Sequence, residues 1–324
     1  MRSNLFERRW GPADPLTQVW TARREVRAAS SDATGGFDAG RVCVPPAGAR
    51  AGTSQRDVPT AGWGRNCLTA VLLTLASSVP VNRAAADGLV PEGSVPAGVS
   101  VETLLRESDR SRGGDAPGMV FESVVTAWKG GKPGKNYSLR IEADRNNSLV
   151  TFLKPEYSKG TKLLVQGRNM WFLSSDVKRP VPISPRQRLL GEASNGDIAT
   201  INYTRDYAGT LTGQCEVNGK SCYVLELKAR GNDVSYDRII YYVSKEDKLG
   251  LKADYFTGSG KHFKTASLEY ENRLEDHGRS IPFVSRMEIQ DEVTKGEKTI
   301  LTYANPESRA IAPTRFDKST LLTE

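Results

Sequence analysis

Residues 160–207 of this 324-residue chain read GTKLLVQGRNMWFLSSDVKRPVPISPRQRLLGEASNGDIATINYTRDY, and they interrupt a regular series of β-hairpin signals. The stretch opens with two short apolar runs, 163–165 and 170–173, which turn residues separate. A basic loop between two prolines follows, and Asn195-Gly196 near the end indicates a turn. Because the middle of the stretch is not strand-like, we expect it to cover a β-sheet rather than to extend it.

The middle of this stretch carries the signals of a short helix. Ser184 has the side chain of an N-cap, Pro185 suits the first helical position, and Gln187 stands where a capping partner belongs. Gly191 can end the helix. We therefore expect an apolar helix over residues 184–190 that closes over the sheet as a lid.

Strand signals lie on both sides of the stretch. A helix is expected first, over residues 101–112, because Ser100 can cap it and its apolar residues share one face. Alternating apolar residues bounded by turn residues then predict strands at 119–127, 137–142, 149–153, 207–217, 222–228, 234–243, 251–256, 262–270, 282–290 and 298–303. About 10–11 strands of this spacing predict a mainly β fold, a single antiparallel sheet curled into a barrel or an open half-barrel, of which we favour the half-barrel.

Two cysteines flank a hairpin turn in the sequence CEVNGKSC, residues 215–222. Asn218-Gly219 at its centre is a strong signal for a two-residue type I′ turn, and pairing outward from that turn sets Cys215 opposite Cys222. Directly opposite residues lie about 4.5–5.5 Å apart at Cα, which a disulfide can bridge. A metal site is the alternative, but no His, Cys or acidic cluster supplies further ligands at the usual spacing. We expect the disulfide and no metal.

An apolar run of 12 residues, 68–79, lies between Arg65 and the small residues 84–86. This pattern is typical of a secretory signal, and the run is shorter than the roughly 20 residues of a membrane-spanning helix. A buried core helix is the alternative. We expect a disordered or spurious leader at 1–62, a signal peptide at 63–86 and an exported domain at 87–324. No cysteine follows the small residues, which favours an exported protein that is soluble, without a lipid anchor, after cleavage near Ala86.

The positive charge of the chain belongs mostly to its first 86 residues. These residues hold 11 of the 45 basic and 6 of the 38 acidic side chains, so the formal charge of +7 falls to +2 for the remaining chain. Cys43 and Cys67 also lie in this part. Cleavage near Ala86 therefore removes most of the excess positive charge that would otherwise indicate a nucleic-acid partner. We expect no such partner.

A series of residues in the quoted stretch resembles the outer-membrane lipoprotein-sorting proteins, relatives of the LolA-type periplasmic lipoprotein carriers. The series consists of Gly160-Thr161-Lys162, Trp171, Lys178-Arg179-Pro180, Ile183-Ser184, Gln187-Arg188, Gly191 and Asp197. The similarity extends from about Val101 to the end, with Cys222 to Leu227, Gly258 to Lys261 and Phe316. The resemblance implies a LolA/LolB-like half-barrel that carries lipoproteins from an inner-membrane exporter to an outer-membrane acceptor.

Apolar side chains on the predicted strands and lid are the candidates for lipid contact, since a half-barrel with a cover encloses an apolar concavity. They are Phe121, Val125, Leu139, Ile141, Phe152, Trp171, Leu189, Leu190 and Tyr207. A plain core is the alternative for the aromatic ones. Four basic side chains in or near the lid, Lys178, Arg179, Arg186 and Arg188, are candidates for contact with a membrane or an acidic partner. They can equally form a solvated face.

Signals for catalysis are weak in the mature part. His262 and His277 both lie at turns, where surface positions are expected. The run Gly258-Ser-Gly-Lys lacks the spacing of a phosphate-binding loop and indicates a hairpin turn. No nucleophile elbow is present, and nothing singles out a pair of carboxylates for acid–base chemistry. We expect a protein that is not an enzyme and has no cofactor.

Two functions remain for such a fold. The first is a periplasmic carrier that shields the acyl chains of lipoproteins or lipids in an apolar groove and shuttles them toward the outer membrane. The second is a non-catalytic envelope sensor or interaction module that serves a transport complex. A fold alone does not decide between them.

Overall fold

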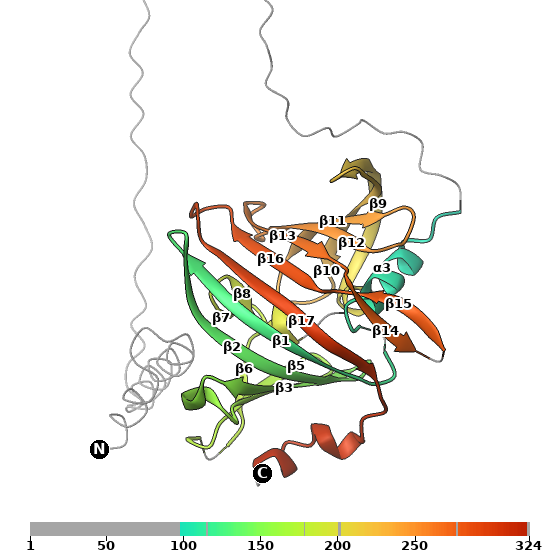
Figure 1. The fold of residues 1–324 in the computed structure, drawn as a ribbon. Helices are drawn as coiled ribbons and strands as arrows, with labels where there is room; N and C mark the ends of the chain where they lie inside the picture. Colours follow the sequence, from blue (N-terminus) through green and yellow to red (C-terminus); the bar gives the residue numbers. More distant parts are fainter. Residues whose placement is uncertain (1–97, 115, 178, 200–201, 277, 323–324) are drawn as a thin grey trace, which may run out of the picture. The chain divides into compact units, whose positions relative to one another are not determined.

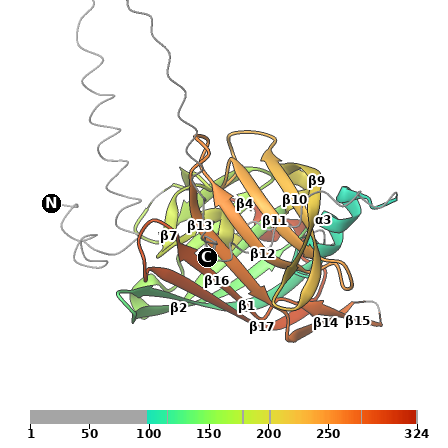
Figure 2. The ribbon, with the colours of Figure 1, turned by 90° about the horizontal axis from the view of Figure 1, so that it is seen from above.

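The computed structural model describes residues 98–114, 116–177, 179–199, 202–276 and 278–322. The predicted leader and signal peptide, with Cys43 and Cys67, lie outside the described residues, as do Lys178 and His277. A 13-stranded antiparallel sheet forms the bulk of the described part, in the order β6-β5-β4-β3-β2-β1-β17-β16-β13-β12-β11-β10-β9 (Figure 1). The sheet curls without closing, so β6 and β9 are its two edges (Figure 2).

The strands follow the predicted order with more interruptions than the sequence suggests. The first half of the sheet contains β1 (Met119–Lys129), β2 (Lys132–Ala143), β3 (Asn147–Lys154), β4 (Lys162–Gln166), β5 (Asn169–Leu173) and β6 (Val181–Ile183). The second half contains β9 (Tyr207–Val217), β10 (Lys220–Ala229), β11 (Arg238–Ser244), β12 (Gly250–Phe256), β13 (His262–Glu269), β16 (Arg286–Asp291) and β17 (Lys298–Ser308). Two separate hairpins, β7–β8 (Arg188–Leu190 and Ala193–Ser194) and β14–β15 (Asn272–Asp276 and Arg279–Phe283), bring the total in the described residues to 17 strands.

Helices are short and few in the described residues. The first, α3 (Val101–Arg110), begins where the sequence predicts, because the Ser100 hydroxyl accepts a hydrogen bond from the Thr103 amide at 3.3 Å. Two others, α4 (Asn195–Ala199) and α5 (Tyr203–Asp206), lie between β8 and β9. Three 3₁₀ turns complete the described part: η2 (Glu156–Ser158), η3 (Pro313–Phe316) and η4 (Thr320–Leu322).

The prediction of a helix over residues 184–190 is wrong. The capping contacts form, since Arg186 N donates to Ser184 Oγ and Ser184 N donates to Gln187 Oε1. The carbonyls of Pro185 and Gln187, however, accept hydrogen bonds from the amides of Gly196 and Asn195, eleven and eight residues later. Those carbonyls are no longer available for a helical ladder, so the chain continues as β7.

Helix occurs later in the same segment than predicted. Asn195-Gly196, which indicates a turn, instead begins α4. Gly191 does mark a reversal, as predicted, but it joins β7 to β8 with φ +58° rather than ending a helix.

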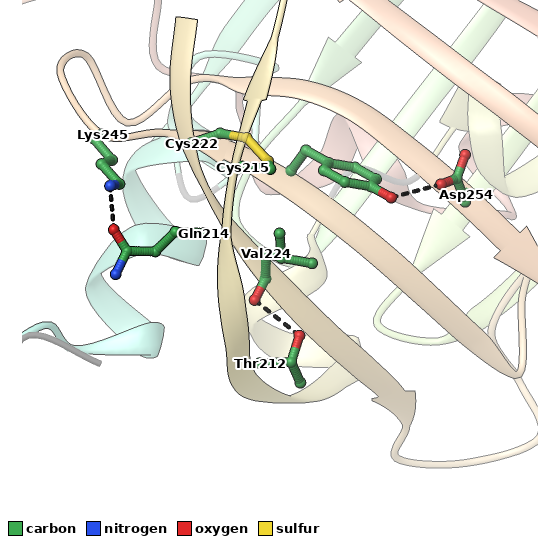
Figure 3. Close-up of a disulfide and its surroundings, with 8 residues drawn as sticks. Thr212, Gln214, Cys215, Cys222, Val224, Lys245 and Asp254 are labelled. Atoms are coloured by element: carbon green, nitrogen blue, oxygen red, sulfur yellow. Dashed lines mark hydrogen bonds between the residues drawn. A yellow bond between two sulfur atoms is a disulfide. The ribbon is translucent and has the colours of Figure 1, made fainter. Parts of the chain in front are cut away.

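The hairpin β9–β10 confirms the predicted disulfide (Figure 3). Asn218 and Gly219 have φ of +51° and +77°, as a type I′ turn requires. Cys215 pairs with Cys222 in the register, and their Cα atoms are 5.1 Å apart. The bond therefore joins the edge strand β9 to its neighbour.

Two apolar clusters lie on opposite faces of the sheet. The larger cluster fills the concave face, and it includes inward side chains of every long strand together with α3, β7, α4 and α5. The smaller lies on the outer face of β3, β4 and β5, where Phe316 and Leu321 of the C-terminal turns cover Leu149, Leu164 and Leu173. The larger cluster therefore lies on the inner, concave face of the curled sheet, and the smaller cluster lies on its outer face.

Candidate ligand-binding site in the concave face

Eight of the nine predicted lipid-contact residues share the concave face. Phe121, Val125, Leu139, Ile141, Phe152, Leu189, Leu190 and Tyr207 are all at most 3% exposed and belong to the larger cluster. Along much of β1 and β2 buried and less buried positions alternate, so the sequence pattern predicted which side chains share a face of the sheet, and the structure shows that this face is the concave one. Here they pack against one another and against the segment between β6 and β9.

Trp171 lies on the other face of the sheet. It packs partly buried against the smaller cluster, and Lys318 Nζ lies 4.0 Å from the centre of its ring. Its neighbours Met170 and Phe172 point inward instead. The structure therefore does not bring Trp171 together with the other eight residues.

Residues 184–199 and 202–206, here called the plug segment, occupy the concave face. Its side chains Leu189, Leu190, Ile198 and Tyr203 are at most 7% exposed and belong to the same cluster as the inward side chains of the sheet. Hairpin β7–β8 lies against β1 (Figure 1). The segment is the predicted cover, although it is built from a hairpin and two short helices.

The cavity beside the plug segment is too small for an acyl chain in this conformation. The cavity beside the plug segment, between Pro185, Gly196 and Tyr203 on one side and Met170 and Tyr236 on the other, has a volume of about 20 Å³. That is space for a single water molecule, whereas ligand pockets usually measure about 300–1,000 Å³. The plug segment therefore fills the concave face beside this cavity.

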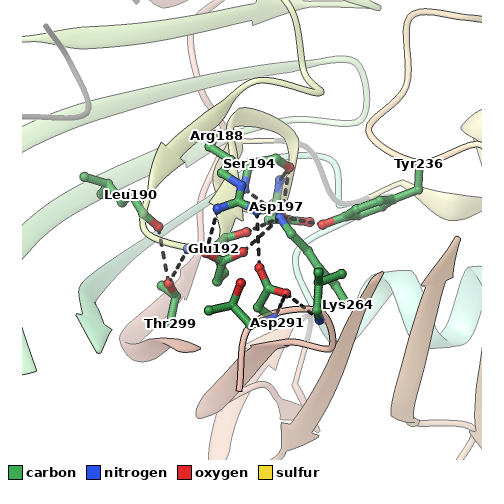
Figure 4. Close-up of polar contacts among 11 residues, drawn as sticks. Arg188, Leu190, Glu192, Ser194, Asp197, Tyr236, Lys264, Asp291 and Thr299 are labelled. Carbon is green, nitrogen blue, oxygen red and sulfur yellow. Dashed lines mark hydrogen bonds and ion pairs between the residues drawn. The ribbon is translucent and has the colours of Figure 1, made fainter. Parts of the chain in front are cut away.

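A buried ionic cluster holds the tip of the plug segment to the sheet (Figure 4). Glu192 and Lys264 are only 2% and 3% exposed, and Lys264 Nζ donates to the Glu192 backbone carbonyl. Arg188 pairs with Glu192 at 2.8 Å and with Asp291 at 3.3 Å. Burial raises the pKa of the Glu192 carboxyl and lowers that of the Lys264 ammonium, because both charges lose water.

A second polar contact holds the start of α4. Asp197 Oδ2 accepts hydrogen bonds from Ser194 N and Ser194 Oγ, both at 2.8 Å, and from Tyr236 Oη at 2.7 Å. The Tyr236 ring in turn stacks on that of Tyr255 with centroids 3.9 Å apart. The plug segment is thus joined to β12 through side chains.

The predicted basic group is largely used within the molecule. Arg186 pairs with Asp237 at 2.7 Å, and Arg188 belongs to the ionic cluster. Arg179 is exposed, and Lys178 is not described. Arg168, which the sequence analysis did not single out, pairs with Asp206 at 3.7 Å and Asp233 at 3.5 Å. These pairs join the β4–β6 end of the sheet to the loop between β10 and β11.

Sequence reasoning also missed two buried charged residues, Asp109 in the last turn of α3 and Arg112 in the turn after it. Asp109 is fully buried and accepts hydrogen bonds from Tyr203 N at 3.0 Å and from Thr204 N and Oγ1. Burial raises the pKa of the Asp109 carboxyl to about 6, although the hydrogen bonds from Tyr203 and Thr204 act to lower it. Arg112, 4% exposed, lies under the ring of Tyr203. The sequence Asp-Arg-Ser-Arg-Gly-Gly, a charged run that ends a helix at two glycines, is the signal that could have found them.

Within the described residues, no group of three or more His, Cys, Asp or Glu side chains is placed to hold a metal ion. None of the described helices is long and apolar enough to cross a membrane. His262 lies at the start of β13 with its side chain 37% exposed, as its position at a turn suggests.

Comparisons with known proteins agree with this architecture. A family model described as that of an uncharacterized protein matches residues 144–323, more than half of the chain. A LolA superfamily protein from Nitrosomonas europaea superposes with a TM-score of 0.62 at 26% identity, covering 68% of this chain and 99% of that one. No curated protein matches the sequence.

Two further solved structures share the fold at lower identity. A putative outer membrane lipoprotein-sorting protein domain from Vibrio parahaemolyticus superposes with a TM-score of 0.58 at 16% identity, over 68% of this chain and 97% of that one. A DUF1329 family protein from Desulfovibrio piger superposes with a TM-score of 0.57 at 23% identity, with the same coverage of both chains.

Proposed function

The chain belongs to the family whose model matches residues 144–323 and has a LolA-like fold, and on that premise we propose that it is a periplasmic carrier of acyl chains. In this proposal the plug segment leaves the concave face, and the acyl chains of a lipoprotein or lipid take its place. An inner-membrane exporter would supply the cargo and an outer-membrane acceptor would receive it. The domain boundaries 63–86 and 87–324 for signal and carrier belong to the same proposal.

The observation that carries the proposal is the way in which the plug segment is attached. Its hairpin β7–β8 forms a two-stranded sheet of its own. Among the described residues, no backbone–backbone hydrogen bond joins the segment to a strand of the 13-stranded sheet; at its last residue the Asp206 carbonyl accepts one at 3.0 Å from Arg230 N, just beyond β10. Side-chain contacts and apolar packing hold the segment instead. It can therefore leave without breaking the ladder of the main sheet.

The free energy gained by burying the apolar side chains of the plug segment and the free energy gained by burying an acyl chain in their place are of similar size. Burial of Leu189, Leu190 and Ile198 stabilises the closed form by about 1.5–3 kcal/mol each, or about 5–9 kcal/mol together. An acyl chain that buries a dozen methylenes gains about 10 kcal/mol at about 0.8 kcal/mol for each. Because the two terms nearly balance, loading and release can both be reversible, as a carrier requires.

Lipid extraction tests the proposal. The exported protein, purified from its native envelope without detergent, is extracted with organic solvent and analysed by mass spectrometry. We expect acyl lipid in stoichiometric amount, and we expect the delipidated protein to keep a triacylated lipoprotein from aggregating. Protein that carries no lipid and gives no protection would refute the carrier and leave an interaction module as the function of the fold.

A further inference from the structure

Arg112 enters the concave face from the turn that follows α3. Gly113 has φ +99°, and a Cβ at this position would lie 2.8 Å from Met119 Sδ, so only glycine fits the turn. The Ser111 carbonyl accepts a hydrogen bond from Val284 N at 2.9 Å, which holds the turn against the connection between β15 and β16. These contacts leave the side chain of Arg112 directed into the interior, where it is 4% exposed.

The guanidinium of Arg112 has few partners for a buried cation. It donates one long hydrogen bond, 3.4 Å from NH1 to Tyr241 Oη, and its central carbon lies 4.7 Å from the centre of the Tyr203 ring. No carboxylate of the described residues forms an ion pair with it within 4.0 Å; the nearby Asp109 is bonded to Tyr203 N and Thr204. Arginine has five N–H donors, of which one contact uses one; no Arg112 nitrogen is a fully buried atom without a partner, and the residue lines the small cavity beside the plug segment.

Other cations near the plug segment have carboxylate partners. Lys264 faces Glu192, and Arg168 and Arg205 at the mouth of the small cavity pair with Asp206. Arg112 borders the same cavity from inside, together with Tyr203 and Tyr236. A buried cation without an ion pair is costly, and such groups are usually kept for a function.

Tyr203 covers the guanidinium of Arg112 and belongs to the plug segment. Its ring covers the guanidinium in the closed form, and its backbone amide is held by Asp109. When the segment leaves the concave face, this cover leaves with it. The guanidinium then faces the emptied interior.

The interior that would open has two different linings. The inward side chains of β1–β5 are mostly aliphatic, including Val125, Leu139, Ile141 and Leu163. The part around Arg112 is formed by tyrosines, Tyr241 and Tyr255 among them, whose hydroxyls can donate hydrogen bonds. A ligand that matches both linings has apolar chains and an anionic head.

We propose that Arg112 binds the phosphate of a phospholipid whose acyl chains occupy the aliphatic half of the concave face. The proposal rests on the proposed function, since it requires the plug segment to move aside for acyl chains. It narrows the cargo, because the lipid anchor of a triacylated lipoprotein has no phosphate. Guanidinium matches phosphate with two parallel N–H···O bonds, which gives the site its selectivity.

The test compares two lipids that share their acyl chains, phosphatidylglycerol and diacylglycerol. Delipidated protein is equilibrated with vesicles that contain both, and the bound lipids are counted by native mass spectrometry. We expect wild type to prefer phosphatidylglycerol by roughly ten- to a hundredfold, the effect of one or two charge-assisted hydrogen bonds. Arg112→Met should bind diacylglycerol as wild type does and lose the preference.

Controls separate the head-group site from the carrier. Arg273→Met, at an exposed arginine of β14, should keep the preference of wild type. If Arg112→Met does not fold, Arg112→Lys carries the test, because lysine keeps the charge but not the paired donors and should reduce the preference several-fold. An unaltered preference in the variant that folds would overturn the proposal.

Two further outcomes are informative. Wild type that binds both lipids equally overturns the role of Arg112 and leaves the carrier intact, whereas wild type that binds neither refutes the carrier as well. Inorganic phosphate is added as a separate arm to distinguish lipid head group from free ion. We expect millimolar phosphate to leave phosphatidylglycerol bound, and displacement of the lipid by phosphate alone would overturn the assignment to a phospholipid.

Discussion

Replacing Gly191 by alanine tests whether the plug segment is a separable cover or an inseparable part of the core. Gly191 joins β7 to β8 with φ +58°. A Cβ at this position would lie 2.6 Å from the Cβ of Ala127 and closer still to Oγ1 of Thr299. Because Ala127 and Thr299 belong to β1 and β17, the added methyl group pushes the hairpin away from the sheet.

Two terms set the size of the effect. A residue with a side chain pays about 1–2 kcal/mol for left-handed backbone, and overpacking adds about 1–3 kcal/mol. Gly167 offers a matched control, since it has the same φ of +58° but no atom within 4 Å of an added Cβ. The difference in the free energy of global unfolding between Gly191→Ala and Gly167→Ala is therefore the overpacking term alone. Because Gly167 lies outside the plug segment, this term, roughly a 5- to 150-fold change in an equilibrium constant, is the least that Gly191→Ala adds to local opening.

Native-state hydrogen exchange measures this opening locally. In Gly191→Ala we expect the protection of amides in residues 188–199 to fall by at least that factor beyond the fall in Gly167→Ala. Amides of β11, β12 and β13 should keep the protection of wild type. Protection that falls equally in the plug segment and in these strands would show that the two unfold together, and the reasoning about a removable cover would be refuted.

Three further predictions concern stability. Cys215→Ala with Cys222→Ala opens a closed loop of 8 residues (sequence separation 7) and should lower the free energy of unfolding by about 2.5 kcal/mol in urea titrations; a loss below about 1 kcal/mol would contradict the chain-entropy estimate. Asp109 has a folded-state pKa of about 6, above its unfolded value of 3.8, so its protonation favours the folded state below pH 4 and this contribution is lost as the pH rises through 6. The stability of wild type relative to Asp109→Asn should therefore fall by on the order of 3 kcal/mol between pH 4 and pH 7, and a difference that is independent of pH would show that burial does not perturb this carboxyl. Phe316→Ala, at a 2% exposed ring over the outer face, should cost about 3–5 kcal/mol in thermal or urea unfolding, whereas Ile311→Ala, at a partly buried side chain of the same cluster, should cost less; equal losses would place the two side chains in similar environments.

Local signals were sufficient for much of the sheet. The alternation in β1 and β2 predicted the inward positions Phe121, Val125, Leu139 and Ile141. Successive side chains of a strand point to opposite faces, so a period of two in the sequence shows which residues lie on the same face of the sheet. In the same way Asn218-Gly219 determined the register of β9 with β10, and hence the disulfide, because few residues tolerate the backbone of a type I′ turn.

Contacts between distant residues decided the rest. The capping hydrogen bond predicted between Ser184 and Gln187 does form. The amides of Asn195 and Gly196, however, donate to backbone carbonyls that a helix would have used for its own hydrogen bonds. Trp171 lies on the opposite face of β5 from its neighbours Met170 and Phe172. A strand pattern cannot tell which face of a sheet is concave. In the structure Trp171 is on the outer face, which the C-terminal turns cover. Arg112 is the clearest case, since a charged residue after a helix is ordinarily exposed and is buried here by Tyr203 and Tyr241 from far along the chain. The sequence alone thus determined most strands of the main sheet, the β9–β10 turn and the disulfide, which depend on neighbouring residues. It did not predict the hairpins β7–β8 and β14–β15, and it predicted 282–290 as one strand where the structure has the end of β15 and then β16. The filling of the concave face depends on which distant groups compete for the same hydrogen bonds and space, and only the tertiary structure decides that.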